Sequence, residues 1–381
     1  MMTFSDMINL LMASYESWLV LLVTAVTCAL IGSFLVLRNL SMIADAISHS
    51  VLLGIILGFF IAGDLDSPWL IFGAAALGVV TVWSTETLSK TGLVENDDAV
   101  GIVYPLFFAL AVILITRFAS NVHLDTDVVL TGEVILTPLD RVELFGFSLP
   151  TALFQMSLLL GVNALFIVIF FKELKLTTFD NQYGHLLGFN AGLLFYVLMT
   201  LNSVTTVLAF DAVGAILVVA FLVGPGASAY LFCKDLKQML VVAMLYGIIN
   251  ATLGYFIGIA WNVSIGGMAA VMTGVTFFLT FLFHRQGLLT ALWRRYRQSK
   301  QLRYDLVLLH IYSHTLQGQE KEELRTDCLD EHFKWSKKEV DKALTVLFKA
   351  DYVTVDTSKQ VYRLTPAGLD RIQAIQQEYG I

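Results

Sequence analysis

Residues 35–58 of the chain are LVLRNLSMIADAISHSVLLGIILG. It places an aspartate and a histidine, Asp45 and His49, four positions apart at the head of an apolar run. On an α-helix, residues at this spacing lie on one face, about 6 Å apart. A carboxylate at membrane depth costs several kcal/mol unless it is paired, hydrated or turned toward a polar cavity. We therefore expect both side chains to face the protein interior.

The composition around this stretch is that of a membrane protein. The 381 residues are 57% hydrophobic and 14% charged, whereas soluble domains are about 25% charged. A spanning helix needs about 20 mostly apolar residues, because its backbone groups must be satisfied within the helix. The candidate runs are 17–37, 43–62, 68–88, 99–117, 151–171, 190–210, 211–232, 239–260 and 263–283. The sequence predicts an all-α polytopic membrane protein with about eight or nine transmembrane helices.

The charge distribution divides the chain near residue 299. The first 299 residues contain 12 Lys and Arg and 18 Asp and Glu, whereas residues 300–381 contain 12 and 13. We therefore predict a transmembrane domain over 1–299 and a small cytosolic α+β domain over 300–381. The three cysteines are far apart and show no metal-binding spacing, so we expect no disulfide framework and no structural zinc site.

Basic residues mark one side of the membrane. They follow the odd-numbered runs, which predicts a cytosolic side there, an N-terminus outside and a C-terminus in the cytosol. Arg117, after the fourth run, is the exception. The polar segment 118–150 is too long for a turn, and we expect a short non-spanning helix in it. The basic residues that fit the rule are Arg38, Lys90, Lys172, Lys175, Lys234, Lys237, Arg285, Arg294, Arg295 and Arg297.

The C-terminal domain has the element order of a winged helix. Helices are expected over 303–316 and about 321–331, and a third begins at Ser336, where Glu339 completes a capping box. Two strands flank a turn at 356–360, and Thr365 with Pro366 begins a last helix. This order resembles the DNA-binding domain of metal-dependent repressors. The domain has 12 basic and 13 acidic residues, so we expect a protein-contact or regulatory module and no nucleic-acid partner.

Three interpretations of Asp45 and His49 remain open from their spacing. The pair could form a structural hydrogen bond with Ser48 and Ser50 nearby. It could relay protons, as intramembrane Asp and His do in transporters. It could also bind a divalent cation, because one carboxylate oxygen and one imidazole nitrogen suit manganese, iron or zinc.

Three segments resemble one family of bacterial membrane proteins. Residues 35–58 are similar to a signature of the permeases of ABC importers for manganese, zinc and iron. The runs DAVGAILVVAFLVGPGASAYLF at 211–232 and FDNQYGHLLGFN at 179–190 resemble two further segments of that family. Gly184 replaces the usual alanine, and residues 262–270 lack the usual proline. The resemblance implies that Asp45 and His49 contact the metal, and that a second permease copy, in a homodimer, raises the number of ligands to four.

The same resemblance assigns residues 176–192 to coupling with an ATPase. Asp180, Gly184 and Gly188 would mark the docking helix, with the two glycines forming a flat face. The pattern alone equally predicts an amphipathic loop with a glycine cap. The chain contains no GxxxxGK[ST] motif, so ATP is expected on a separate partner subunit. Asp211 is either a water-exposed boundary residue or an entrance ligand for the metal.

The sequence therefore predicts a transport subunit and not an enzyme: the permease of an ATP-driven importer of divalent metal ions, working by alternating access. Manganese is favoured, with zinc or iron as alternatives, and no resident cofactor is expected. The expected partners are an ABC ATPase, a second permease copy, an extracytoplasmic metal-binding protein and membrane lipid, in the bacterial cell membrane. The alternatives are a membrane-tethered transcriptional sensor that uses the winged helix and a proton-coupled carrier.

Overall fold

The computed structural model describes residues 14–64, 67–118, 134–144, 147–284, 287–326, 329, 333 and 335–379. Contacts divide the chain into two units, Met1–His284 and Arg285–Ile381. The compositional boundary at residue 299 falls inside a continuous helix, α14 (Leu288–Leu316), which includes the basic run at 294–300.

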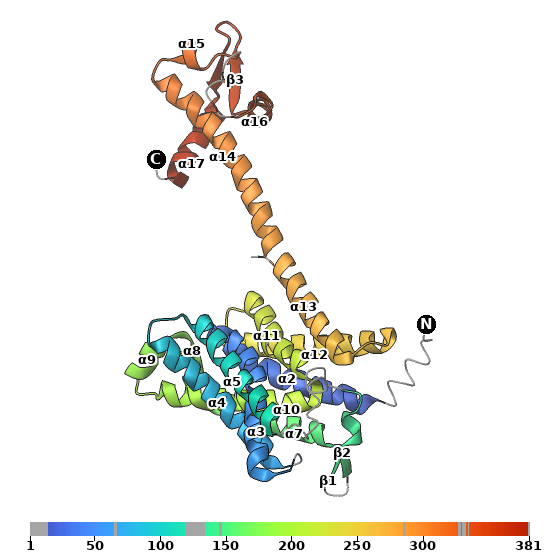
Figure 1. Ribbon diagram of the computed structural model, residues 1–381. Helices are drawn as coiled ribbons and strands as arrows, with labels where there is room; N and C mark the ends of the chain where they lie inside the picture. The colour runs from blue at the N-terminus through green and yellow to red at the C-terminus, as the bar shows by residue number, and fades with distance from the viewer. Residues whose placement is uncertain are drawn as a thin grey trace. The chain divides into compact units, whose positions relative to one another are not determined.

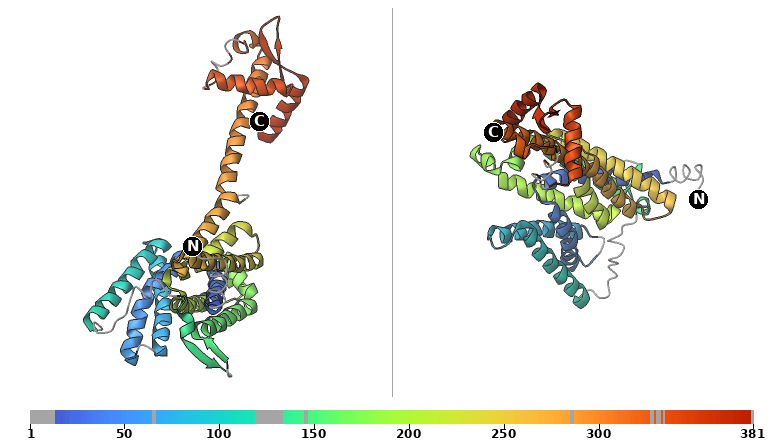
Figure 2. Two further views of the ribbon diagram at one scale, coloured as in Figure 1. Left: turned by 90° about the vertical axis from the view of Figure 1, so that its right-hand side faces the viewer. Right: turned by 90° about the horizontal axis from the view of Figure 1, so that it is seen from above.

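The first unit is a bundle of long helices (Figure 1). Within the described ranges, nine helices are long and apolar enough to cross a membrane, which confirms the predicted number. α3, α4 and α5 lie side by side in this bundle (Figure 2). The spanning helices are α2 (Tyr15–Leu37), α3 (Ser41–Ala62), α4 (Pro68–Lys90), α5 (Asn96–Phe118), α7 (Thr151–Ile169), α10 (Ala191–Val213), α11 (Ala215–Phe232), α12 (Leu236–Trp261) and α13 (Ile265–Phe283).

Two short helices, α8 (Phe171–Phe179) and α9 (Asn181–Leu186), gather several helix ends at one end of the bundle. Arg38, just after α2, donates hydrogen bonds to Thr177 (3.2 Å) and Thr178 (3.3 Å) of α8. Lys175 of α8 forms a 2.6 Å ion pair with Asp235, between α11 and α12, and this hydrogen bond lowers the pKa of Asp235. Basic residues that the sequence assigned to one membrane side therefore lie at one end of the bundle.

The opposite end carries a hairpin of β1 (Arg141–Leu144) and β2 (Phe147–Pro150), preceded by a short 3₁₀ helix, η1 (Thr137–Leu139). The two terminal nitrogens of the Arg141 guanidinium donate hydrogen bonds of 2.9 Å to the two carboxylate oxygens of Glu16. These bonds fix the hairpin to the start of α2. In the described part of 118–150, the expected short non-spanning helix appears only as the three-residue η1, and residues 119–133, 145 and 146 lie outside that part.

Glycines let α3 and α4 approach to backbone contact. A Cβ atom added at Gly54 would lie 2.4 Å from the carbonyl oxygen of Gly73, and a Cβ atom at Gly73 would lie 2.4 Å from the carbonyl oxygen of Gly54. Small residues at such crossings allow the close packing that holds helices together in lipid. Gly161 of α7 differs, since an added Cβ atom there meets nothing within 4 Å.

We expect Gly54→Ala to lower the free energy of unfolding of the purified protein by about 1–3 kcal/mol, because the added methyl group forces α3 and α4 apart. Gly161→Ala is the matched control and should be neutral or stabilising by up to about 1 kcal/mol, since alanine is the better helix former. Thermal unfolding of both variants in the same detergent measures the difference. Equal melting temperatures for the two variants would show that the crossing tolerates a side chain.

The second unit has its own core. Besides α14 it contains α15 (Glu320–Glu323), α16 (Lys337–Lys349), β3 (Val353–Asp356), β4 (Val361–Leu364) and α17 (Pro366–Tyr379). β3 and β4 form the predicted antiparallel hairpin. The two capping predictions are also confirmed: Ser336 and Glu339 form a capping box, and Thr365 accepts a hydrogen bond from Gly368 N–H at 3.1 Å. Arg303 of α14 pairs with Glu339, and this pairing, with the capping bonds, lowers the pKa of Glu339 to about 2.

The second predicted helix of this unit is shorter than expected. α15 covers four residues where the sequence predicted a helix over about 321–331, and a β-bridge then joins Arg325 to Val361. Residues 327–328, 330–332 and 334 lie outside the described residues, and so does Cys328. In the described part, Cys28 and Cys233 are free thiols.

Candidate metal-transport site

Asp45 and His49 form an open pair on α3. His49 Nε2 lies 3.6 Å from Asp45 Oδ1, which is beyond hydrogen-bond length. The two side chains keep 41% and 39% of their surface exposed. Both side chains are therefore half-buried in this chain, whereas the sequence led us to expect them in its interior. The residues lie in the second and third turns, about 6 and 12 Å from the start of the helix.

The neighbouring serines do not bind this pair. Ser48 donates to the backbone carbonyl of Asp45, while Ser50 donates to the carbonyl of Ile47 and accepts a hydrogen bond from Thr81 of α4 at 2.9 Å. A closed structural network through Asp45, His49 and these serines is therefore absent. Neither serine therefore bonds to the Asp45 carboxylate or to the His49 ring nitrogens.

Two aromatic residues of α5 support the imidazole. Tyr104 stacks on the His49 ring with centroids 5.5 Å apart, and Phe108 meets it edge-on at 6.1 Å. These two residues are one helical turn apart, so one face of α5 holds one face of the ring. Their contact with His49 is not predictable from the sequence, because aromatic residues at helical spacing in an apolar run are indistinguishable from ordinary packing residues.

A cavity of about 280 Å³ lies beside the start of α3. Its polar lining includes Glu86 and Lys90 of α4 and Asp97 of α5, and it reaches Ile43, two residues before Asp45. Glu86 and Asp97 thus line a cavity near the start of α3, and Asp45 and His49 lie outside its lining.

Asp211 is not brought near the pair. It is exposed and lies close to the C-terminal end of α10. α10 begins beside α9, at the end of the bundle where α3 also begins, so the length of the helix separates Asp211 from Asp45. Its charged neighbour is Asp140, at the opposite end of the bundle. Asp211 therefore does not share a site with Asp45 and His49 within this chain.

The segment singled out for ATPase coupling forms a compact turn. Asp180 caps α9, accepting a hydrogen bond from Tyr183 N–H at 2.9 Å. Gly188 ends α9 with a left-handed φ of 83°, and the N–H groups of Gly188 and Phe189 bond back to the carbonyls of His185 and Gly184. This is the Schellman arrangement, and it matches the glycine cap that the sequence left open.

The expected flat face of two glycines is not present. Gly184 is buried, and a Cβ atom added there would lie 3.0 Å from a methyl group of Thr177. This glycine therefore packs α9 onto α8. Large apolar and aromatic side chains are exposed on the segment instead, next to the exposed polar residues Asp180, Gln182 and His185. The exposed apolar and aromatic residues are Phe179, Tyr183, Leu186 and Leu187.

A protein-family comparison matches nearly all of the first unit. The model described as the ABC 3 transport family matches residues 11–284. The chain belongs to this family.

Relatives of the ABC 3 transport family are similar over most of the chain. The zinc transport system membrane protein TroD of Treponema pallidum (strain Nichols) is 41% identical over 364 residues, which cover 94% of this chain and 98% of TroD. The manganese transport system membrane protein MntD of Bacillus subtilis (strain 168) is also 41% identical, over 292 residues that cover 76% of this chain and 99% of MntD. Among solved structures, PsaBC from Streptococcus pneumoniae in complex with Fab matches with a TM-score of 0.61 and 29% identity, covering 74% of this chain and 96% of that chain.

Membership of the ABC 3 transport family confirms the predicted class. The chain is a multi-pass membrane permease of the bacterial plasma membrane and a transport subunit of a metal importer. It is not an enzyme, and ATP hydrolysis belongs to a separate subunit. An ATPase and a substrate-binding protein are the partners that such a permease implies. The tethered-sensor alternative is not favoured by these relatives.

Proposed function

We propose that Asp45 and His49 supply half of a transient divalent-cation site, and that a second permease copy supplies the other half. The observation that carries this proposal is the open pair itself, with two donors 3.6 Å apart and about 40% of each side chain exposed. A carboxylate at membrane depth needs a partner or a polar cavity. A second pair facing the first across a shared pathway meets that need and raises the number of ligands to four.

The donor set fits the proposed cargo. Two carboxylates and two imidazoles offer oxygen and nitrogen ligands, which suit manganese, iron(II) and zinc. No cysteine lies close to the pair in the sequence. We propose manganese as the first cargo, with zinc or iron as alternatives. Relatives of equal identity are named for zinc and for manganese, so similarity alone gives no preference.

We propose that α8 and α9 receive the ATPase. Asp180, Gly184 and Gly188 act by shaping the segment: Asp180 begins α9, Gly184 packs it on α8 and Gly188 ends it. The exposed apolar residues then form the surface on which the partner docks. With this end in the cytosol, the N-terminus lies outside and the C-terminus inside, in agreement with the positive-inside rule.

We propose that the second unit is a winged helix with a regulatory or protein-contact role, over residues 300–381 with the preceding part of α14 as its lead-in. Support comes from the order of α14, α15, α16, the β3–β4 hairpin and α17. The alignment with MntD covers 99% of that relative yet only 76% of this chain. A transport unit without such an extension therefore occurs among the relatives, which fits a regulatory role.

Manganese, zinc and iron are made limiting in turn. Cells lacking this protein should then contain less manganese than the parent strain. Elemental analysis measures the depletion, and a plasmid copy of the gene should restore the metal. Depletion of zinc alone or of iron alone would identify that metal, instead of manganese, as the cargo. Unchanged contents of all three metals would contradict the transport proposal. Co-purification provides a second readout, because a transport subunit should bring down an ATPase.

A further inference from the structure

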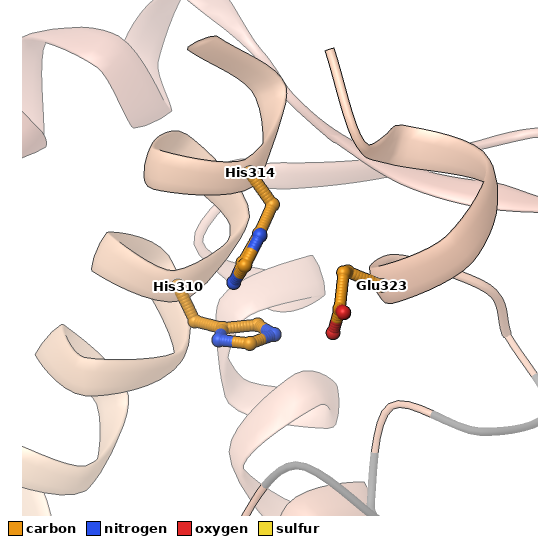
Figure 3. A group of neighbouring side chains, drawn as sticks. All are labelled: His310, His314 and Glu323. Atoms are coloured by element: carbon orange, nitrogen blue, oxygen red, sulfur yellow. The ribbon is translucent and has the colours of Figure 1, made fainter. Parts of the chain in front are cut away.

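A cluster of metal-binding side chains lies in the second unit, apart from the transport site. His310 and His314 lie one turn apart on α14, and Glu323 ends α15. One ligand atom from each residue lies within 4.8 Å of the others. Figure 3 shows the two imidazoles and the carboxylate converging from the two helices. All three side chains are partly buried.

The surroundings orient one of these imidazoles for metal binding. His314 Nδ1 lies 3.0 Å from Gln319 Oε1. An amide oxygen only accepts hydrogen bonds, so Nδ1 carries the proton and the lone pair is left on Nε2. Metal-binding histidines commonly donate their second ring N–H to such an oxygen, which fixes the tautomer and the ring orientation. The His310 ring is held between His314, at a centroid distance of 4.4 Å, and Phe333, at 5.1 Å.

We propose that His310, His314 and Glu323 form a binding site for a divalent transition-metal ion of the zinc class. Two imidazoles and one carboxylate, with water in the fourth position, are a donor set that zinc uses. Ligand atoms on a tetrahedral zinc are about 3.4 Å apart at bond lengths of about 2.1 Å. The three atoms must therefore draw together by little more than about 1 Å, which side-chain rotation supplies. The site does not depend on the transport pathway of the first unit.

Metal binding at this site joins two parts of the second unit. Glu320 of α15 forms a 3.1 Å ion pair with Arg363 of β4. Leu324, just after α15, accepts a hydrogen bond from Tyr362 N–H at 2.9 Å. The segment 320–326 is thus attached to the hairpin, and the metal attaches it to α14 as well. The ion therefore stiffens the connection between the helix that leads into this unit and its β-hairpin.

Zinc binding to the purified full chain tests the proposal. The chain carries Asp45→Asn and His49→Gln to remove the transport pair, and an affinity tag without histidines. This protein should retain one bound zinc per chain, and adding His314→Gln or Glu323→Gln should abolish that binding. Glu322→Gln, on the same short helix but outside the cluster, is the matched control and should keep the zinc. Equal zinc binding in the Glu322→Gln, His314→Gln and Glu323→Gln proteins would overturn the site.

Two further measurements separate lost ligands from a misfolded unit. Gln319→Leu removes the hydrogen bond to His314 without removing a ligand and should weaken zinc binding on the order of 10-fold. Zinc should also slow hydrogen exchange of the amides in 320–326 in the parent chain and not in Glu323→Gln, whose exchange without zinc should match the parent. Zinc-independent exchange in the parent chain would contradict the proposed connection.

Discussion

Replacing Asp45 by asparagine or His49 by glutamine should abolish metal accumulation while the protein still assembles in the membrane. Each change removes one donor from each half of a four-ligand site and leaves the packing of α3 intact, because both side chains are about 40% exposed. Losing even the hydrogen-bond partner of a metal ligand costs about 10–100-fold in affinity, so loss of a ligand should reduce uptake by more than about 100-fold. Radioactive manganese or zinc uptake by cells, normalised to permease in the membrane, measures the effect.

Two controls isolate the pair from general effects of charge and of histidine. Asp98→Asn removes an exposed carboxylate from the first turn of α5, and His284→Gln removes a histidine just after α13. Both variants should transport at the parental rate. Parental uptake in the Asp45 and His49 variants would remove the site assignment and leave these residues with a structural role only.

A charge on the exposed face of α9 should separate the permease from its ATPase. Leu186 is 82% exposed in this chain, and it would be buried in the docked complex. Leu186→Asp places an unpaired carboxylate in that contact, where burial is costly. The expected loss of at least about 2 kcal/mol, typical of a central interface residue, corresponds to an association weakened roughly 30-fold. Pull-down of the ATPase by tagged permease, with ATP-dependent uptake, measures it.

The matched control for this variant lies at the other end of the bundle. Leu139 of η1 is 77% exposed, and Leu139→Asp makes the same chemical change there. It should leave ATPase association unchanged. A normal pull-down with Leu186→Asp, or equal losses for both variants, would show that α9 does not form the docking surface.

Local patterns in the sequence predicted most of the fold. The spans follow from apolar length, because the bilayer requires about 20 residues whatever the packing. The caps at Ser336 and Thr365 and the β3–β4 hairpin follow from short-range chemistry that involves neighbouring residues alone. Each of these features was found where the sequence predicted it.

Features that depend on tertiary contacts were not predictable in the same way. The burial of Gly184 depends on Thr177 of another helix, and a spacing of small residues does not distinguish a buried face from an exposed one. The exposure of Asp45 and His49 depends on which helices surround α3. The cluster in the second unit had a partial signal, two histidines at helical spacing, but its third member comes from a different helix.

The transport proposal requires one dication between the Asp45 and His49 pairs of two permease copies. Anomalous X-ray scattering at the manganese or zinc absorption edge, from the assembled permease loaded with that metal, would locate this ion. The expected result is a single peak within bonding distance of Asp45 and His49, with the pair of a second copy on its other side. A peak elsewhere in the membrane domain, or a structure in which both side chains face lipid with no second copy opposite, would contradict the claim.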